Sequence, residues 1–254
     1  MNSQYFHSPV FARIAFYRPG FWKDYVTARI MSLTEELVAR CHRDVSDEGP
    51  DPAAQHLDED DYARMIEETL ASRPDDGPLW LFAYGSLIWK PEVEHTEEKV
   101  ALARGWHRSF CVNMTRWRAT QAQPGLMMAM DRGGQCKGVA LRLMDGDRRQ
   151  QLDKLFRREM TLKPSTYKPR WLKLATAEGP LVALGFVANR KGRAYAGGIS
   201  EDEVVERIAT SCGHWGSAAD YLYNVVKNLE QRAIHDRHLW RLQHLVAERI
   251  AARA

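Results

Sequence analysis

The sequence contains no long hydrophobic run, and this bears first on membranes. No stretch approaches the roughly 20 consecutive apolar residues that a membrane-spanning helix needs. Residues 1–29 mix aromatic residues with arginines and lack the continuous apolar segment of a secretory signal. Because 44% of the residues are hydrophobic and 27% are charged, we expect a soluble globular protein without a membrane partner.

Cofactor motifs are absent as well. The chain has neither a phosphate-binding P-loop nor a G-x-G-x-x-G fingerprint, so we expect no nucleotide cofactor. His235, Asp236 and His238 could bind a metal, but no further ligand follows at a metal-like spacing. We therefore interpret Asp236 as a helix cap and expect no metal. Cysteines are few and form no C-x-x-C pair, which favours free thiols in a reducing cytoplasm. They are Cys41, Cys111, Cys136 and Cys212.

Charge is unevenly distributed along the chain. Residues 44–76 contain twelve acidic residues against two arginines, so the rest of the chain carries an excess of about +13. A basic surface attracts anions, including nucleic acid. Trp106, Arg108, Trp117 and Arg118 interleave residue types that stack on bases and bind phosphate. Strand alternation places several of them on opposite faces, so we expect no nucleic-acid partner.

Hydrophobic periodicity and turn residues indicate an α+β fold. Short strands separated by glycine-rich turns favour a small mixed or antiparallel sheet, closed like a barrel and flanked by helices. The predicted strands cover residues 79–84, 100–103, 106–114, 126–130, 136–143, 170–175 and 181–187. Helices are predicted over residues 62–70, from Asp147 to about Glu159, from Ser200 to Gly213, and over the C-terminal tail.

Composition changes near residue 77. Ser32 and Glu35 have the spacing of a capping box, so a helix is expected after Met31. Residues 50–61 have the composition of a linker, and prolines and a glycine in residues 73–78 mark a boundary. We therefore predict a helical N-terminal extension with an acidic linker over residues 1–77 and the main domain over residues 78–254. Met31 is an alternative initiator, and residues 1–29 also fit a transit peptide.

The strand predicted at residues 79–84 ends in a tight loop. Its six residues carry no charge, which suits a strand covered on both faces. Gly85 lets the backbone turn where a side chain would obstruct it. Successive amides of such a loop can converge on a carboxylate or a developing oxyanion. An ordinary strand-to-turn exit fits the same residues, so the loop alone leaves both interpretations open.

Glu159 departs from the pattern of its predicted helix in two ways. It follows Leu152, Leu155 and Phe156 at helical spacing, which places its carboxylate on the buried apolar face while the arginines at 157 and 158 turn away. It also stands at the C-terminal end of the helix, where the macrodipole opposes a negative charge. Both effects raise the pKa of a carboxyl group toward neutrality, as a general base requires. A frayed helix end with Glu159 in solvent is the alternative.

Several short motifs in order along the chain resemble one enzyme family. They begin with residues 84–87, Tyr-Gly-Ser-Leu, which we name the signature loop, followed by Ile-Trp-Lys-Pro at residues 88–91. Further matches are GWHRSFC at 105–111, QPG at 123–125, GVALRL at 138–143, REM at 158–160 and DYL at 220–222. The ordered set resembles the ChaC-like γ-glutamylcyclotransferases over about residues 79–250.

This resemblance implies a reaction and a set of site residues. In a γ-glutamyl peptide the α-amine attacks the γ-carbonyl of the same residue, which releases 5-oxoproline without a cofactor. The family's catalytic glutamate matches Glu159, which would act as general acid and base in a catalytic domain over residues 78–254. The substrate-binding residues implied by the resemblance are Leu81, Phe82, Ala83, Tyr84, Gly85, Ser86, Leu87 and Tyr167. The absence of an asparagine between Ser86 and Leu87 favours glutathione, which would yield Cys-Gly as the second product.

The chain also departs from the family pattern. Ala83 replaces a glycine that usually precedes the signature tyrosine, and Leu126 stands where a basic residue is common. Residues 161–167 form a longer segment than the family has between the glutamate and a nearby tyrosine. Two alternatives therefore stay open: a cyclotransferase acting on γ-glutamyl amino acids or amines, and a non-catalytic module that binds γ-glutamyl metabolites. The sequence does not predict the oligomeric state.

Overall fold

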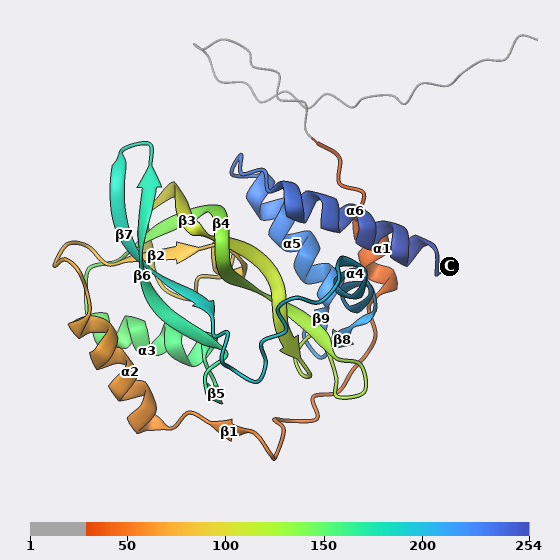
Figure 1. Ribbon diagram of the computed structural model, residues 1–254, viewed down its shortest axis with the longest axis horizontal. Helices are drawn as coiled ribbons and strands as arrows, with labels where there is room; N and C mark the ends of the chain where they lie inside the picture. The colour runs from red at the N-terminus through yellow and green to blue at the C-terminus, as the bar shows by residue number, and fades with distance from the viewer. Residues whose placement is uncertain (1–28, 254) are drawn as a thin grey trace, which may run out of the picture. The chain divides into compact units, whose positions relative to one another are not determined.

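Five strands form a closed barrel in the computed structural model, which describes residues 29–253 (Figure 1). Their order around the barrel is β2-β4-β3-β6-β7, and neighbouring strands run antiparallel. Short parallel contacts join β7 to β2 and to β4, so the expected mixed barrel-like sheet is confirmed. The strands are β2 (Trp80–Ala83), β3 (His95–Met114), β4 (Gly125–Leu143), β6 (Tyr167–Thr176) and β7 (Gly179–Ala188).

Strands β3 and β4 are longer than the sequence analysis predicted. Gly105, with φ of 80°, and Gly133 and Gly134, with φ of 107° and 64°, were expected to separate strands. Instead the register shifts between Arg104 and Trp106, and both strands continue past the glycines. Such an irregularity is a β-bulge, which bends a strand without ending it. The predicted breaks were wrong because a glycine with positive φ serves a bulge as readily as a turn.

The helices fall into two groups. Helices α4 (Glu201–Thr210), α5 (Ala218–Glu230) and α6 (Arg237–Ala251) pack together, with α1 (Glu35–Arg40) against α5 and α6. Helix α3 (Arg148–Glu159) lies beside α2 (Glu59–Ala71), away from that group in Figure 1. Phe156 of α3 contacts Phe186 of β7, with ring centroids 5.9 Å apart, so α3 packs on the barrel.

Three helix starts have the side-chain caps that were expected. Asp147 caps α3, Ser200 caps α4 and Asp236 caps α6. Three predictions about boundaries were wrong. Helix α2 begins at Glu59 and not at residue 62, because Asp58 and Asp61 form a capping box there. Thr34, rather than Ser32, caps α1, because the Ser32 hydroxyl bonds to His244 Nδ1 at 2.9 Å. Helix α4 ends at Thr210 and not at Gly213, which lies in β8 (Cys212–Gly213), paired with β9 (Gly216–Ser217).

Residues from Ser32 onward form one compact unit, so the part of the N-terminal extension that begins at Ser32 packs with the barrel domain. The short strand β1 (Gln55–His56) pairs with β5 (Leu162–Lys163), and α2 follows it. The functional boundary at residue 77 stays a prediction, and the interpretation of residues 1–28 lies outside the described residues.

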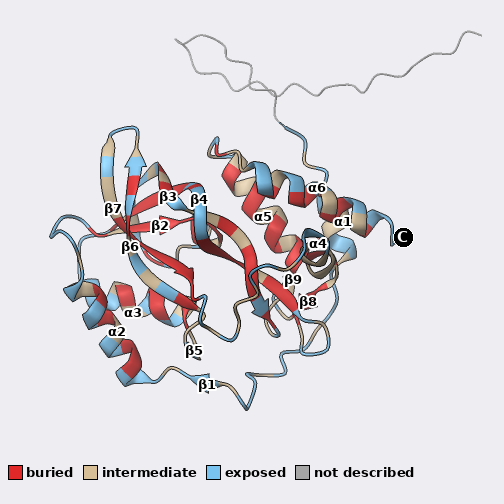
Figure 2. Ribbon diagram, in the orientation of Figure 1, coloured by how far each residue is buried: buried red, intermediate tan, exposed pale blue. Residues whose placement is uncertain are grey.

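Buried residues concentrate in the barrel strands and on the inner faces of the helices (Figure 2). Leu81, Phe82 and Phe186 are fully buried, as are Leu152 and Phe156 of α3. The continuous apolar strand before the signature loop is thus confirmed as β2. Within the described residues, no helix is both long and apolar enough to cross a membrane.

Candidate functional site

The signature loop leaves the end of β2 and turns at once into the 3₁₀ helix η1 (Ser86–Ile88). The buried side chain of Arg108 stabilises the signature loop, because its Nε donates to the carbonyl of Tyr84 at 2.7 Å. The other guanidinium nitrogens donate to the Lys137 carbonyl at 2.6 Å and to the Asp236 carboxylate at 2.9 Å. The Tyr84 hydroxyl donates to the Phe186 carbonyl at 2.8 Å. The barrel wall and the start of α6 therefore fix both the backbone and the side chain of Tyr84.

Gly85 lies against the side chain of Tyr221, which comes from α5. A Cβ atom at Gly85 would lie 2.9 Å from the Tyr221 hydroxyl oxygen and 3.1 Å from the Met128 methyl carbon. Glycine is required here by the close approach of a tyrosine, and this approach brings α5 to the loop.

Glu159 is the last residue of α3, and its side chain is only 16% exposed. It continues the face formed by the buried residues Leu152, Leu155 and Phe156, so the expected position of Glu159 on this face is confirmed. Burial raises the pKa of the Glu159 carboxyl above its usual value, Arg158 opposes this rise, and the negative charge of Glu92 adds to it. A carboxyl group with a raised pKa can both accept and return a proton near neutral pH.

Arg158 lies beside Glu159 and does not turn away as the sequence analysis predicted. Its Nε lies 3.0 Å from Glu159 Oε1, and its Nη2 donates to the Ser86 hydroxyl at 3.2 Å. Its Nη1 donates to the Lys90 carbonyl and lies 3.3 Å from a Glu92 carboxylate oxygen. The prediction was wrong because helical spacing fixes where a side chain starts, while a long arginine near a helix end can curl back to acceptors on another segment.

Three buried tyrosines lie within electrostatic reach of the carboxylate. Burial raises the pKa of the hydroxyl groups of Tyr84, Tyr167 and Tyr221, and the charge of Glu159 raises each of them further. That shared influence puts all three within electrostatic reach of Glu159. Their hydroxyl groups stay protonated at neutral pH and can donate hydrogen bonds; that of Tyr167 now donates to the Met128 carbonyl at 3.3 Å.

The structure separates the residues suggested for substrate binding into two sets. Leu81, Phe82 and Ala83 are fully buried in β2, where they pair with β4, so they support the loop from within the barrel wall. The other members gather with Glu159 at the end of this strand. They are Tyr84, Gly85, Ser86, Leu87 and Tyr167.

Two further residues lie at this site for which no sequence pattern indicated a role in the reaction. Tyr221 belonged to a family motif but carried no chemical signal of its own. Arg118 lies with its guanidinium carbon 5.7 Å from the centroid of the Tyr221 ring, and its Nη1 donates to Asp220 at 2.7 Å and to the Ser217 carbonyl at 2.9 Å. Only the fold of the β3–β4 loop onto the start of α5 could reveal this contact.

No cluster of three or more histidine, cysteine, aspartate or glutamate side chains able to hold a metal occurs among residues 29–253. His235 Nδ1 pairs instead with Glu230 at 2.7 Å, and Asp236 caps α6 as expected while it binds Arg108. The four cysteines are free thiols, three of them buried.

Comparisons with known proteins agree with this arrangement. The model of the family described as ChaC-like protein matches residues 79–249. The glutathione-specific gamma-glutamylcyclotransferase of Escherichia coli (strain K12) is 37% identical over 175 residues, which cover 68% of this chain and 75% of that protein. Glutathione-specific gamma-glutamylcyclotransferase 1 of Mus musculus is 32% identical over 155 residues, which cover 58% and 68%.

The fold is shared with a solved structure from yeast. The crystal structure of a gamma-glutamyl cyclotransferase specific to glutathione aligns with a TM-score of 0.62 at 21% identity, covering 68% of this chain and 97% of that chain. The family match extends over most of this chain and includes the signature loop, Glu159 and Tyr221. The chain therefore belongs to the ChaC-like protein family.

Proposed function

We propose that this protein is a γ-glutamylcyclotransferase that cleaves glutathione to 5-oxoproline and cysteinylglycine. The observation that carries the proposal is the buried carboxyl of Glu159, with its raised pKa, at the end of the strand that delivers the signature loop. Relatives that are named as glutathione-specific cyclotransferases support the choice of substrate.

The reaction needs a base and then an acid at one place. The α-ammonium of the γ-glutamyl residue loses a proton to Glu159, and the free amine attacks the γ-carbonyl carbon to close a five-membered ring. The bond between that carbon and the cysteine nitrogen then breaks as Glu159 returns the proton to the leaving nitrogen. Glu159 next takes the remaining extra proton from the ring nitrogen and passes it to the released amine, so that the products are 5-oxoproline and cysteinylglycine with a protonated amine. Holding amine and carbonyl in contact supplies much of the rate, because the step is intramolecular. A single carboxyl with a raised pKa suits both transfers.

The signature loop and Arg158 have complementary tasks in this proposal. Backbone amides of Tyr84, Gly85, Ser86 and Leu87 would hold the γ-glutamyl carboxylate or the oxyanion that develops on the γ-carbonyl. Arg158 bonds to both Ser86 and Glu159, so it fixes the distance between the loop and the base.

We also propose a small-molecule partner in a reducing, cytoplasmic setting and no nucleic-acid partner. The free thiols support the setting. Arg108 and Arg118, which suggested phosphate binding by composition, are engaged by Tyr84, Asp236 and Asp220 within the protein.

Substrate comparison tests the proposal. Purified protein is incubated with glutathione and, separately, with γ-glutamyl-alanine, without added metal or nucleotide, and 5-oxoproline is followed by mass spectrometry. The proposal predicts product from glutathione and little from γ-glutamyl-alanine. The reverse preference would assign the protein to γ-glutamyl amino acids, and product from neither substrate with folded protein would favour a binding module.

A further inference from the structure

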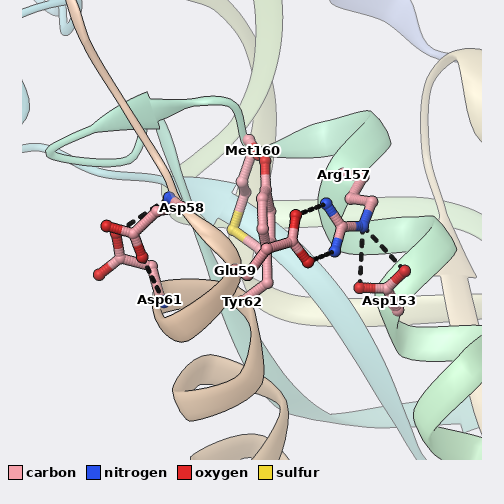
Figure 3. Close-up of polar contacts among 7 residues, drawn as sticks. All are labelled: Asp58, Glu59, Asp61, Tyr62, Asp153, Arg157 and Met160. Atoms are coloured by element: carbon pink, nitrogen blue, oxygen red, sulfur yellow. Dashed lines mark hydrogen bonds and ion pairs between the residues drawn. The ribbon is translucent and has the colours of Figure 1, made fainter.

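The N-terminal extension contacts the backbone directly after Glu159. The hydroxyl group of Tyr62, in α2, donates to the carbonyl of Met160 at 2.9 Å (Figure 3). The next carbonyl, that of Thr161, accepts from the backbone N–H of Leu57 at 3.1 Å. Strand β1 then pairs with β5, so the extension holds the chain over residues 160–163. These contacts come from residues before position 79, where the family match begins.

The same extension also contacts helix α3, which ends at Glu159. Arg157 donates to both carboxylate oxygens of Glu59, at 2.9 and 2.5 Å, and its guanidinium carbon lies 4.5 Å from the centroid of the Tyr62 ring. It also bonds to Asp153 one helical turn earlier, at 2.8 Å (Figure 3). Tyr62 therefore contacts residues on both sides of Glu159: its ring lies against Arg157, and its hydroxyl group donates to the Met160 carbonyl.

The contact between Tyr62 and Met160 is buried, and an ion pair between Lys163 and Asp61 lies beside it. Tyr62 is 6% exposed and Met160 is fully buried. The Met160 carbonyl lies just past the helix end, where backbone acceptors lack helical partners, so the Tyr62 hydroxyl satisfies an acceptor that would otherwise be costly to bury. Lys163 pairs with buried Asp61 and lowers the pKa of that carboxyl, which fastens β5 to α2.

Residues 161–167 are also longer than the segment expected from the family resemblance between the catalytic glutamate and a nearby tyrosine. This segment contains β5, the strand that pairs with β1 of the extension. The extension, which lies outside the family match, therefore meets this segment next to Glu159.

We propose that residues 55–71, which we name the brace, position Glu159 for catalysis, and that Tyr62 is the central positioning residue. This inference rests on the proposed function of Glu159 as general base. Among the described residues, no hydrogen bond or ion pair joins the brace to the signature loop, which Arg108 and Arg158 contact instead. The brace acts by fixing the backbone on both sides of the carboxylate, and a misplacement of about 1 Å in a reacting group can cost a factor of about 100 in rate.

Tyr62→Phe tests the inference with a matched control, Tyr223→Phe. The first variant removes only the hydroxyl bond to Met160 and keeps the ring against Arg157. Tyr223 also ties the extension to the barrel domain, since its hydroxyl donates to Glu35 at 2.7 Å, but it does so between α5 and α1. Both full-length variants are checked for folding by circular dichroism and assayed on glutathione well below their unfolding temperatures.

We expect kcat of Tyr62→Phe to fall about tenfold with KM within about twofold of the wild-type value, while Tyr223→Phe keeps both. The acid limb of the kcat profile should also move to lower pH, because a loosened carboxylate gains water and loses the burial that raises its pKa. The groups that share its electrostatic environment are unchanged in this variant. They are Arg158, Glu92, Tyr84, Tyr167 and Tyr221.

Other results would overturn the inference. One is a kcat of Tyr62→Phe within twofold of wild type, and another is an equal loss of kcat in Tyr223→Phe. A third is a loss of kcat in Tyr62→Phe with the acid limb unmoved, which indicates only a smaller amount of folded protein. A wild-type protein that makes no 5-oxoproline contradicts the proposed function and this role with it, whereas active wild type with unaffected Tyr62→Phe contradicts the role alone.

Discussion

A Cβ atom at Gly85 would lie 2.9 Å from the Tyr221 hydroxyl oxygen, closer than side-chain carbons normally approach. Gly85→Ala should therefore lower the free energy of unfolding by about 1–3 kcal/mol through overpacking. In a Tyr221→Phe background the cost should be smaller, because the crowded oxygen is gone. Thermal or urea unfolding of the four proteins measures this coupling. Gly146→Ala, with no neighbour within 4 Å, is the control; equal costs in both backgrounds would contradict the packing argument.

Glu159→Gln should reduce kcat on glutathione by a factor of about 100 to 10,000, the range that a general acid–base group contributes. It should also stabilise the protein at neutral pH. The pKa of Glu159 in the folded protein is raised above the usual 4.5, so above that raised pKa its negative charge lowers the free energy of unfolding. Below the pKa of the unfolded state the carboxyl is protonated in both states, and this loss of stability disappears. Unfolding at pH 4 and pH 8 should show a stability gain only at the higher pH. The exposed Glu248, changed to Gln, is the control; retained turnover would remove Glu159 from the role.

The activity of the wild-type protein should fall on acidification with a midpoint above the usual glutamate pKa of 4.5. The base must be ionised to accept a proton, and burial of Glu159 shifts its ionisation to higher pH. Measurement of kcat/KM for glutathione from pH 4 to pH 9 locates this limb. A limb at or below pH 4.5 is incompatible with a buried base.

Arg158→Gln should lower kcat about tenfold, because the link between Ser86 and Glu159 is lost. Its positive charge lowers the pKa of Glu159, so removal of that charge should move the acid limb to still higher pH. Lys154→Gln, on an exposed position of the same helix, should leave kcat and the profile unchanged. A shift to lower pH in Arg158→Gln would contradict the assigned electrostatics.

Local pattern was sufficient for much of the site. A charge-free apolar run followed by Gly85-Ser86 predicted β2 and its loop, because burial on both faces and a sharp exit each leave a compositional mark. Helical spacing after Leu152, Leu155 and Phe156 predicted the burial of Glu159, since the period of a helix fixes which face a residue occupies.

Tertiary contacts were beyond the reach of local pattern. The direction of Arg158 depends on acceptors at Ser86 and Lys90, which lie in another segment. The bulges that carry β3 and β4 past Gly105 and Gly133 depend on the register between two strands. Strand β1 has two residues, too few for any period, and its partner β5 follows about a hundred residues later along the chain. The contact of Tyr62 with Met160 arises only when these pieces come together.

Isotope incorporation tests the intramolecular mechanism most directly. Wild-type protein is incubated with glutathione in ¹⁸O-labelled water, and the products are analysed by mass spectrometry. Attack of the α-amine on the γ-carbonyl predicts unlabelled 5-oxoproline and cysteinylglycine in equal amounts, because no water enters the bond that forms. Glutamate, or 5-oxoproline that carries ¹⁸O, would show that water attacks the γ-carbonyl and would contradict cyclisation at this site.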